Sequence, residues 1–270
     1  MVLLAALSGL LIAVGGLLMG SGGLILFVGI AVAMNFGSYW FSSDLMLRVS
    51  HAHEIERDQD PRLFAIVEHV AERAGMPVPR VYVIDSPQPN AFATGRNPKH
   101  AAIAVTAGIR SLLTERELRG VLGHELAHVR NRDILTSSIV ATIAGAISMI
   151  GWFGLWFGGG RRVGLLAIVA VILAPIAAAI IQMAIGRARE YQADRDGARF
   201  VRDPEALASA LAKLELGAQQ ATLTVAQSTA HLYIVNPLRG GRVGRLFSTH
   251  PPVEERVRRL HEMRPDEFLS

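Results

Sequence analysis

Two histidines and a glutamate fall within five residues in the stretch His124-Glu125-Leu126-Ala127-His128. Residues four apart share one face of an α-helix, so His124 and His128 would present two imidazole nitrogens to a single ion. Neutral imidazole and carboxylate groups bind zinc tetrahedrally, and a catalytic zinc keeps three protein ligands and leaves the fourth position for water. The spacing therefore predicts two ligands of a hydrolytic metal site, with Glu125 as the base for its water.

The segment around this stretch carries the signals of an amphipathic helix. Thr114 and Glu117 have the spacing of a capping box, in which each side chain bonds the backbone of the other residue. Apolar residues recur at helical spacing behind the histidines, namely Leu118, Val121, Leu122 and Val129. The alternative is that the three polar residues occur here by chance, as solvated or core-satisfied groups. The pattern within its helix favours the metal site.

The third ligand should be a carboxylate or a histidine, because the chain has no cysteine. A later helix carries Glu190 and Asp194 four residues apart, on one face. Two histidines from one helix and Glu190 from the other make the ligand count of an open catalytic zinc site, and Asp194 could accept the distal N–H of a ligand imidazole. The alternative is a surface helix whose acids pair with neighbouring arginines. The upstream motif favours the ligand role for Glu190.

Two long apolar runs predict membrane helices. Residues 1–47 contain one charged side chain, Asp44, and residues 134–186 contain two, Arg161 and Arg162. The first run lacks a basic leader and continues at once into a second span, which favours retained helices over a cleaved signal peptide. We expect four spans in two hairpins, at about residues 2–20, 24–41, 135–157 and 163–186.

The basic residues predict the orientation of the chain in the membrane. Of 27 Lys and Arg, 12 lie within residues 48–132 and 13 from residue 187 onward, which places both polar blocks in the cytoplasm. The pair Arg161-Arg162, in the turn of the second hairpin, opposes this assignment. The pI near 9.9 could indicate nucleic-acid binding, but no basic stripe interleaved with aromatic residues is visible, so we expect no nucleic-acid partner.

A small sheet is expected just before the metal helix. Residues 81–84 and 101–105 are short apolar runs typical of strands, and a helix capped by Asp60 precedes them. Between the strands, residues 90–95 form either an ordinary strand or an edge strand whose backbone groups could pair with an extended peptide. The sequence alone leaves both interpretations open.

His250 lies between Thr249 and the double proline Pro251-Pro252, in a turn with little freedom. It could stabilise an oxyanion during a reaction, or it could cap the terminal helix. Both interpretations remain open, and residues 215–245 carry no pattern that predicts a role.

Four motifs together carry a family resemblance: HELAH at 124–128, REYQAD at 189–194, NAFATG at 90–95 and FSTHPP at 247–252. With the paired apolar hairpins, they resemble the HtpX-type membrane zinc metalloproteases, relatives of the CAAX prenyl-protein endopeptidases. The motifs keep the family order over essentially the whole chain. The resemblance implies an α+β membrane protein with a mainly helical, gluzincin-type metalloprotease domain, a small β-sheet and four transmembrane helices in two hairpins.

The resemblance also implies an activity, a cofactor and a site. The activity is that of an endopeptidase facing the cytoplasm from a multi-pass position in the plasma (inner) membrane, where it cleaves misfolded or damaged membrane proteins in quality control and stress response. Its cofactor would be one Zn²⁺ per chain, and its partners would be polypeptide substrates and the lipid bilayer. The implied site comprises the metal ligands His124, His128 and Glu190, the base Glu125, and a substrate-binding edge of Asn90, Ala91, Phe92 and Ala93. The residues themselves add Asp194 as a supporting group and His250 as a catalytic candidate.

The expected organisation alternates membrane and polar segments. A transmembrane hairpin in residues 1–42 precedes the first part of the protease domain, residues 43–133, which contains the metal helix. A second hairpin occupies residues 134–186, and residues 187–270 complete the protease domain and supply the third ligand.

Two rival functions follow from the same motif. One is an intramembrane protease, which Arg116, Arg119, Arg130 and Arg132 disfavour because charges at this density do not belong in hydrocarbon. The other is a non-catalytic membrane scaffold in which zinc only holds two helices together. Glu125 argues against the scaffold, because a structural zinc site needs no base.

Overall fold

The computed structural model describes residues 43–157, 165–220 and 251–268, together with a few positions between 20 and 41. The chain divides into two compact units. One combines Met1–Phe41 with Leu135–Gly186, and the other combines Ser42–Ile134 with Arg187–Ser270. The expected boundaries at 42, 133 and 186 lie within one residue of these, and the assignment of the segments to membrane hairpins and protease domain stays a prediction.

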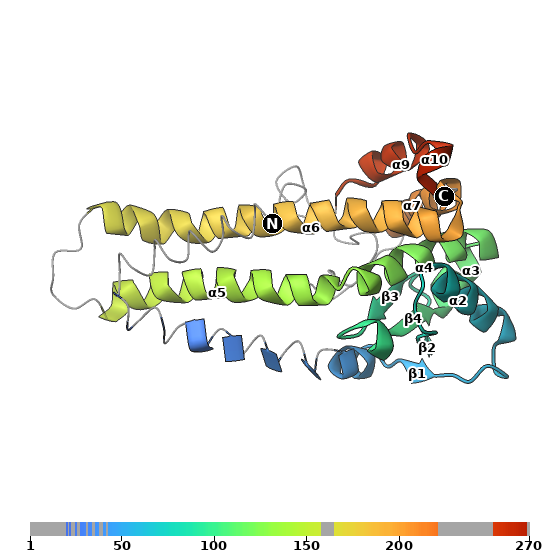
Figure 1. Cartoon of the computed structure of the whole chain (residues 1–270), viewed down its shortest axis with the longest axis horizontal. Helices are drawn as coiled ribbons and strands as arrows, with labels where there is room; N and C mark the ends of the chain where they lie inside the picture. The colour runs from blue at the N-terminus through green and yellow to red at the C-terminus, as the bar shows by residue number, and fades with distance from the viewer. Residues whose placement is uncertain are drawn as a thin grey trace. The chain divides into compact units, whose positions relative to one another are not determined.

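The second unit contains a four-stranded sheet in the order β1-β2-β4-β3 (Figure 1). The strands β2 and β4 pair in parallel, and the other two pairs are antiparallel. The expected strands at 81–84 and 101–105 are therefore present, with β3 beside β4 at one edge of the described sheet. The strand bounds are His53–Glu54 for β1, Arg80–Ile84 for β2, Ala91–Thr94 for β3 and Ala102–Thr106 for β4, and the short 3-10 helix η1 spans Pro98–His100.

Helices of the second unit pack on this sheet and on one another. Helix α4, Glu115–Arg130, contacts β3, the helix α2 and the helix α7, and α7 in turn packs against α9. Figure 1 shows α4 with β3 on one side and α7 on the other. The remaining bounds are Pro61–Arg73 for α2, Ala107–Leu112 for α3, Pro204–Gln220 for α7, Val253–His261 for α9 and Pro265–Phe268 for α10.

The core of this unit is built around the inner face of α4. Leu122 and Leu126 are fully buried there, among Ile103 of β4, Leu207 of α7 and Leu260 of α9. Burying a Leu or Ile side chain contributes about 1.5–3 kcal/mol relative to leaving it exposed. The face that holds α4 in place is thus the apolar stripe that lies behind the two histidines.

Local sequence signals set where α4 begins. The side chain of Thr114 accepts from the backbone N–H of Glu117, and the Glu117 carboxylate accepts from the backbone N–H of Thr114, so the expected capping box forms. The buried Glu117 carboxylate also accepts from Ser209 and Lys213 of α7, at 2.6 and 2.8 Å. The cap therefore ties α4 to α7 as well as starting the helix.

Glu117 should make stability depend on pH. Burial by itself raises the pKa of Glu117, but the hydrogen bonds from Lys213, Ser209 and Thr114 outweigh it and lower the pKa from 4.5 to about 2. A carboxyl whose pKa is lower in the folded state stabilises the fold above its unfolded pKa, and this contribution is lost as pH falls from about 4.5 to about 2.

We expect Glu117→Gln to lower the free energy of unfolding by about 1–2 kcal/mol at pH 7, because the amide loses one cap acceptor and the charge-assisted bond from Lys213. The measurement is the melting temperature of both proteins in detergent with a chelator, across pH 7 to 3. The difference between the two melting temperatures should decrease as the wild-type Glu117 carboxyl takes up its proton. A difference that stays constant with pH would contradict the stabilising role of the ionised Glu117 carboxylate.

The first unit contains two long helices that continue into the second unit. Helix α5 spans Asp133–Phe157 and α6 spans Leu165–Val201. Within the described residues, one stretch, Ile172–Val201, is long and apolar enough to cross a membrane, and a shorter apolar stretch covers Asp133–Ser148. The expected spans at 2–20 and 24–41 lie wholly or largely outside the described residues, so four transmembrane helices remain a prediction.

Candidate metal centre

The two histidines of α4 point their Nε2 atoms at a common position. These atoms are 3.1 Å apart, and the rings meet edge to face with centroids 4.6 Å apart. Two nitrogens bound tetrahedrally to one zinc at about 2.0–2.1 Å would be roughly 3.3 Å apart. The helical spacing of His124 and His128 therefore produces a nitrogen pair of the right separation.

Glu190 of α6 supplies a carboxylate to the same position. Its Oε2 lies 3.7 Å from Nε2 of His124, and its Oε1 lies 3.6 Å from Nε2 of His128. One ligand atom from each of the three residues falls within 4.8 Å of the others, and this is the one such group among the described residues. The structure thus brings together the three residues that the sequence nominated as ligands.

A carboxylate holds the second nitrogen of each imidazole. Oδ1 of Asp194 lies 2.9 Å from Nδ1 of His124, and Oδ2 of Asp133 lies 2.6 Å from Nδ1 of His128. A hydrogen bond at Nδ1 places the proton there and leaves Nε2 as the metal-binding nitrogen. The sequence predicted the position of Asp194. It carried no periodic signal for Asp133, which is the first residue of α5 and folds back on His128.

Each of these supporting carboxylates has an arginine beside it. Arg256 of α9 is fully buried and donates from Nε and Nη2 to the two oxygens of Asp194, at 2.8 and 2.7 Å. Its Nη1 lies 3.6 Å from Glu190. On the other side, Nε of Arg189 lies 3.0 Å from Oδ1 of Asp133.

The charges of the site shift the pKa values of its members. Burial alone would raise the pKa of Asp194, but the charge and hydrogen bonds of Arg256 and the bond to His124 lower it to about 2. Burial alone would lower the pKa of His128, but the Asp133 hydrogen bond and the nearby Glu190 and Glu125 carboxylates raise it above its usual range.

The formal charge of the site fits a divalent cation. Its carboxylates Glu125, Asp133, Glu190 and Asp194 carry four formal negative charges, and Arg189 and Arg256 carry two positive ones. This leaves −2 in a largely buried cluster when both imidazoles are neutral, which is the form that binds a metal. Uncompensated buried charge is costly, so buried charges are paired or bind metals. A dication completes the balance and meets two imidazoles and a carboxylate, a donor set suited to zinc.

Sequence reasoning missed Arg256 as a member of the site. The available signal was its position on α9, where Val253, Arg256 and Leu260 follow helical spacing and are all buried. A charged residue within an apolar stripe needs a buried partner. The pattern did not indicate which partner, because Asp194 lies 62 residues earlier in the chain.

Glu125 connects the metal centre to the sheet. Its side chain is 7% exposed, and Oε2 accepts from the backbone N–H of Ala93 at 2.9 Å. Ala93 lies on β3 opposite Ile103 of β4, so its N–H points away from β4 and toward α4. The outer edge of β3 therefore faces the carboxylate that follows the first histidine.

The other residues of the expected substrate edge hold β3 in place. The backbone N–H of Asn90 donates to Oγ1 of Thr106, and its carbonyl accepts from the backbone N–H of Thr106, so the pairing of β3 with β4 starts here. The side chains of Ala91 and Phe92 are buried. His250 lies outside the described residues, and its expected role stays a prediction.

Two glycines allow α6 to approach α4 closely enough to form this site. A Cβ on Gly197 would lie 2.5 Å from the backbone nitrogen of His124, and one on Gly123 would lie 2.9 Å from the carbonyl oxygen of Gly197. Real Cβ atoms do not approach backbone atoms this closely. Only glycine therefore fits at positions 123 and 197, where the two helices touch. Gly123 directly precedes the predicted ligand His124.

We expect Gly197→Ala to destabilise the protein and weaken metal binding together. Overpacking costs about 1–3 kcal/mol. This equals or exceeds the roughly 1 kcal/mol by which alanine is favoured over glycine inside a helix. Melting temperature and zinc affinity measure the two effects. The control is Gly217→Ala in α7, where the new Cβ would meet side-chain atoms no closer than 3.6 Å. Equal behaviour of the two variants would show that the helix crossing tolerates a methyl group.

Comparisons with known proteins give a family match and related sequences. Residues 57–264 match the description Peptidase family M48. The chain is 53% identical to "Protease HtpX homolog" of Ralstonia pickettii, over 97% of this chain and 94% of that protein. It is 52% identical to "Protease HtpX homolog" of Burkholderia thailandensis, over 97% and 95% of the two chains.

A solved structure shares the fold. The crystal structure of S. mikatae Ste24p aligns with a TM-score of 0.60 at 19% identity and covers 95% of this chain. The present chain spans 62% of the length of that protein. At this identity the likeness concerns the fold alone.

Proposed function

The chain belongs to peptidase family M48 and is a metalloprotease, and from this premise we propose that it is a zinc-dependent endopeptidase whose metal is held by His124, His128 and Glu190. The observation that carries the proposal is the convergence of one donor atom from each of these residues within 4.8 Å. The −2 formal charge of the surrounding cluster supports a divalent ion. The expected stoichiometry is one Zn²⁺ per chain.

Glu125 is the proposed general base. Zinc, when bound in such a site, acts as a Lewis acid toward water and toward the scissile carbonyl. Glu125 accepts the proton of the attacking water and then delivers it to the nitrogen of the leaving amine. The N–H of Ala93 keeps the carboxylate oriented while it is ionised. Asp194 and Asp133 hold the two imidazoles with Nε2 available, and Arg256 keeps Asp194 ionised.

The outer edge of β3 is the proposed binding site for an extended substrate. An extended peptide can add to a sheet edge through main-chain hydrogen bonds. In an antiparallel pair alternate residues direct their backbone groups to opposite sides, so Ala91 and Ala93 share the side that faces Glu125. The N–H of Ala93 donates to Glu125, so the peptide would pair with the backbone groups of Ala91 and with the carbonyl of Ala93. A peptide paired there would lie alongside the base. Asn90 and Phe92 act by holding the strand against β4 and the core.

The proposed setting is the inner membrane, with the metal centre in the cytoplasm and with damaged or misfolded membrane proteins as substrates in a stress response. The long apolar helices α5 and α6 support it. So does the outward display of large apolar side chains along α6, namely Val169, Ile172, Leu173, Ile176 and Ile180. Clustering of basic residues in both polar segments supports the cytoplasmic side.

The decisive experiment measures zinc and peptide hydrolysis on the same detergent-purified protein. We expect one zinc per chain, cleavage of casein, loss of cleavage with a chelator, and recovery with added zinc. Stoichiometric zinc without cleavage of casein or of an unfolded membrane protein would support the scaffold instead. Cleavage that survives complete removal of metal would overturn the proposed site.

The absence of cysteine from the sequence permits a clean test of orientation. A single cysteine introduced at the exposed position Asp58 should react with an impermeant maleimide in inverted membrane vesicles. It should not react in intact spheroplasts. Labelling of intact spheroplasts would place the metal centre on the opposite side of the membrane.

A further inference from the structure

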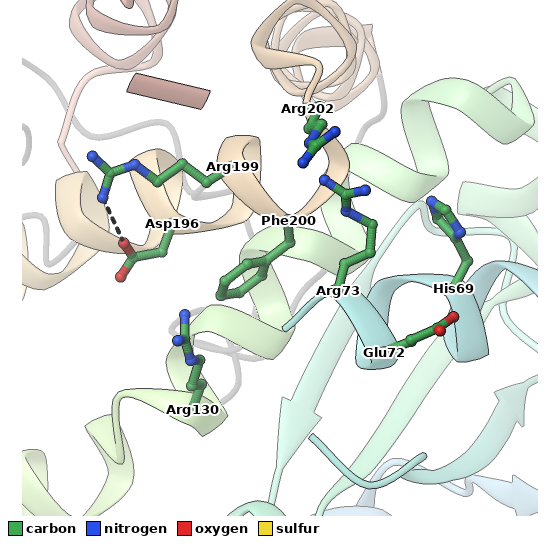
Figure 2. A pocket seen from close by; sticks show the side chains of 8 residues that line it. All are labelled: His69, Glu72, Arg73, Arg130, Asp196, Arg199, Phe200 and Arg202. Carbon is green, nitrogen blue, oxygen red and sulfur yellow. Dashed lines mark ion pairs between the residues drawn. The ribbon is translucent and has the colours of Figure 1, made fainter. Parts of the chain in front are cut away.

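A second polar pocket lies where three helices of the second unit end. Its volume is about 550 Å³, and its walls come from α2, α4 and the last turns of α6 (Figure 2). Four arginines line it, Arg73, Arg130, Arg199 and Arg202, against the two carboxylates of Glu72 and Asp196. The pocket therefore carries a net positive charge, and none of its lining residues is among the proposed metal ligands.

Two of these arginines direct like charges at each other. Arg73 is the last residue of α2, Arg202 directly follows α6, and in Figure 2 their guanidinium groups point toward one another. Within the described part of the chain neither arginine forms an ion pair with a carboxylate, and Glu72 does not pair with Arg73. Facing cations repel unless an anion lies between them.

The other two arginines already have protein partners. The guanidinium carbon of Arg130 lies 5.1 Å from the centroid of the Phe200 ring. Arg199 lies 3.8 Å from Asp196 and donates to the backbone carbonyl of Glu267. Asp196 also accepts from the side chain of Asn131. Its charge is thus engaged within the wall. The open positive charges of the pocket are those of Arg73 and Arg202, and Glu72 carries the open negative one.

Helix capping explains only part of this arrangement. The C-terminus of a helix carries a partial negative charge, so a cation at each of the three helix ends is favourable. That effect gives no reason for guanidinium groups from two different ends to face each other. Arg202 also has φ of 55°, a conformation in which glycine is usual after a helix and which is uncommon for other residues.

We propose that this pocket binds a phosphate group, held between the guanidinium groups of Arg73 and Arg202. The planar fork of arginine matches two phosphate oxygens at once, and two forks from opposite walls can hold one phosphate on both sides. Arg130 lies on the other side of the Phe200 ring and adds a more distant positive charge. The volume exceeds that of a bare phosphate ion, so the group can be part of a larger molecule.

The phosphate can come from a lipid headgroup or from solution. Leu135, where the first unit resumes, follows Arg130 by five positions, so the two Cα atoms are at most about 18 Å apart. An anionic phospholipid headgroup at the membrane surface is therefore within reach of the site. Free phosphate presents the same oxygens to the same arginines.

The test is a binding titration on full-length, detergent-purified protein at constant ionic strength. Melting temperature is followed with sodium phosphate, with phosphatidylglycerol and with sodium chloride, since a bound ligand stabilises the folded state in a saturable way. The variants are the double substitutions R73Q/R202Q and R73K/R202K. The matched control is R62Q/R264Q, which removes the same charge from exposed positions outside the pocket.

We expect wild type and control to respond saturably to phosphate or to phosphatidylglycerol, with at least tenfold weaker apparent affinity in R73Q/R202Q. The R73K/R202K variant keeps the charge but loses the fork, and its affinity should fall less. A response to the lipid alone assigns the site to a headgroup, and a response to phosphate alone assigns it to a soluble ligand.

Three results would overturn the proposal. The first is a wild type that gives no saturable response to either ligand. The second is a double variant that responds like the wild type. The third is a double variant whose melting temperature is lower by the same amount with and without ligand, which would assign the arginines to helix capping alone. None of these measurements depends on peptidase activity, so the proposed function is tested separately.

Discussion

Glu125→Gln should keep its zinc and lose peptide hydrolysis by about a thousandfold or more. A positioned general base contributes typically 10²–10⁴-fold, and the amide of glutamine cannot take a proton from water. Glutamine has the same shape, and its carbonyl oxygen can still accept from the N–H of Ala93. The substitution therefore changes the chemistry of the group with little change in packing.

The measurement pairs initial rates of casein or peptide cleavage with the zinc content of the same sample. Glu117→Gln is the matched control, because it makes the same replacement at a buried position on the same helix, within the cap network and outside the metal centre. That control should retain activity at temperatures where it is folded. A Glu125→Gln enzyme with more than a tenth of the wild-type rate would remove Glu125 from the role of base.

Glu190→Gln should weaken zinc binding by at least about a hundredfold and abolish activity at submicromolar zinc. Mutation of a residue that only supports a metal ligand typically lowers metal affinity 10–100-fold, and loss of a ligand itself should lower it by more than that. The substitution also removes one negative charge from a cluster whose formal charge is −2, so the balance with a dication is lost. Arg256 keeps its two bonds to Asp194 and so retains a buried partner.

Zinc affinity can be measured by competition with a chromophoric chelator, with circular dichroism to verify the fold. Glu254→Gln is the control, because this exposed residue lies on α9 near Arg256 and has no contact with the site. Wild-type zinc affinity in Glu190→Gln would mean that the third ligand lies elsewhere in the chain. A fall in affinity in both variants would point to a general effect of lost charge.

The two supported imidazoles illustrate how precisely the fold must arrange this centre. His124 depends on Asp194 and, through it, on Arg256 from α9. His128 depends on Asp133 at the start of α5, beside Arg189 of α6. Each of the two proposed ligand histidines is therefore oriented by segments outside its own helix. The second unit must be complete before the site has its geometry.

Local features of the sequence were sufficient for half of the site. The four-residue spacing of His124 and His128 determines that they share a face once the segment is helical, and the Thr114 and Glu117 cap with its apolar stripe makes it helical. Short apolar runs in the sequence likewise predicted the strands at 81–84 and 101–105. These patterns depend on residues a few positions apart, so they can be recognised in the sequence alone.

Only the tertiary structure decided which distant groups meet these local ones. The crossing at Gly123 and Gly197 brings Glu190 and Asp194 to α4, and a buried Arg256, 132 residues from His124, completes the cluster. The bond from Ala93 to Glu125 and the arginine pocket at three helix ends arise in the same way. A pattern in the sequence does not predict these contacts. They depend on how closely two packed backbones can approach each other and on which buried charges must then be balanced.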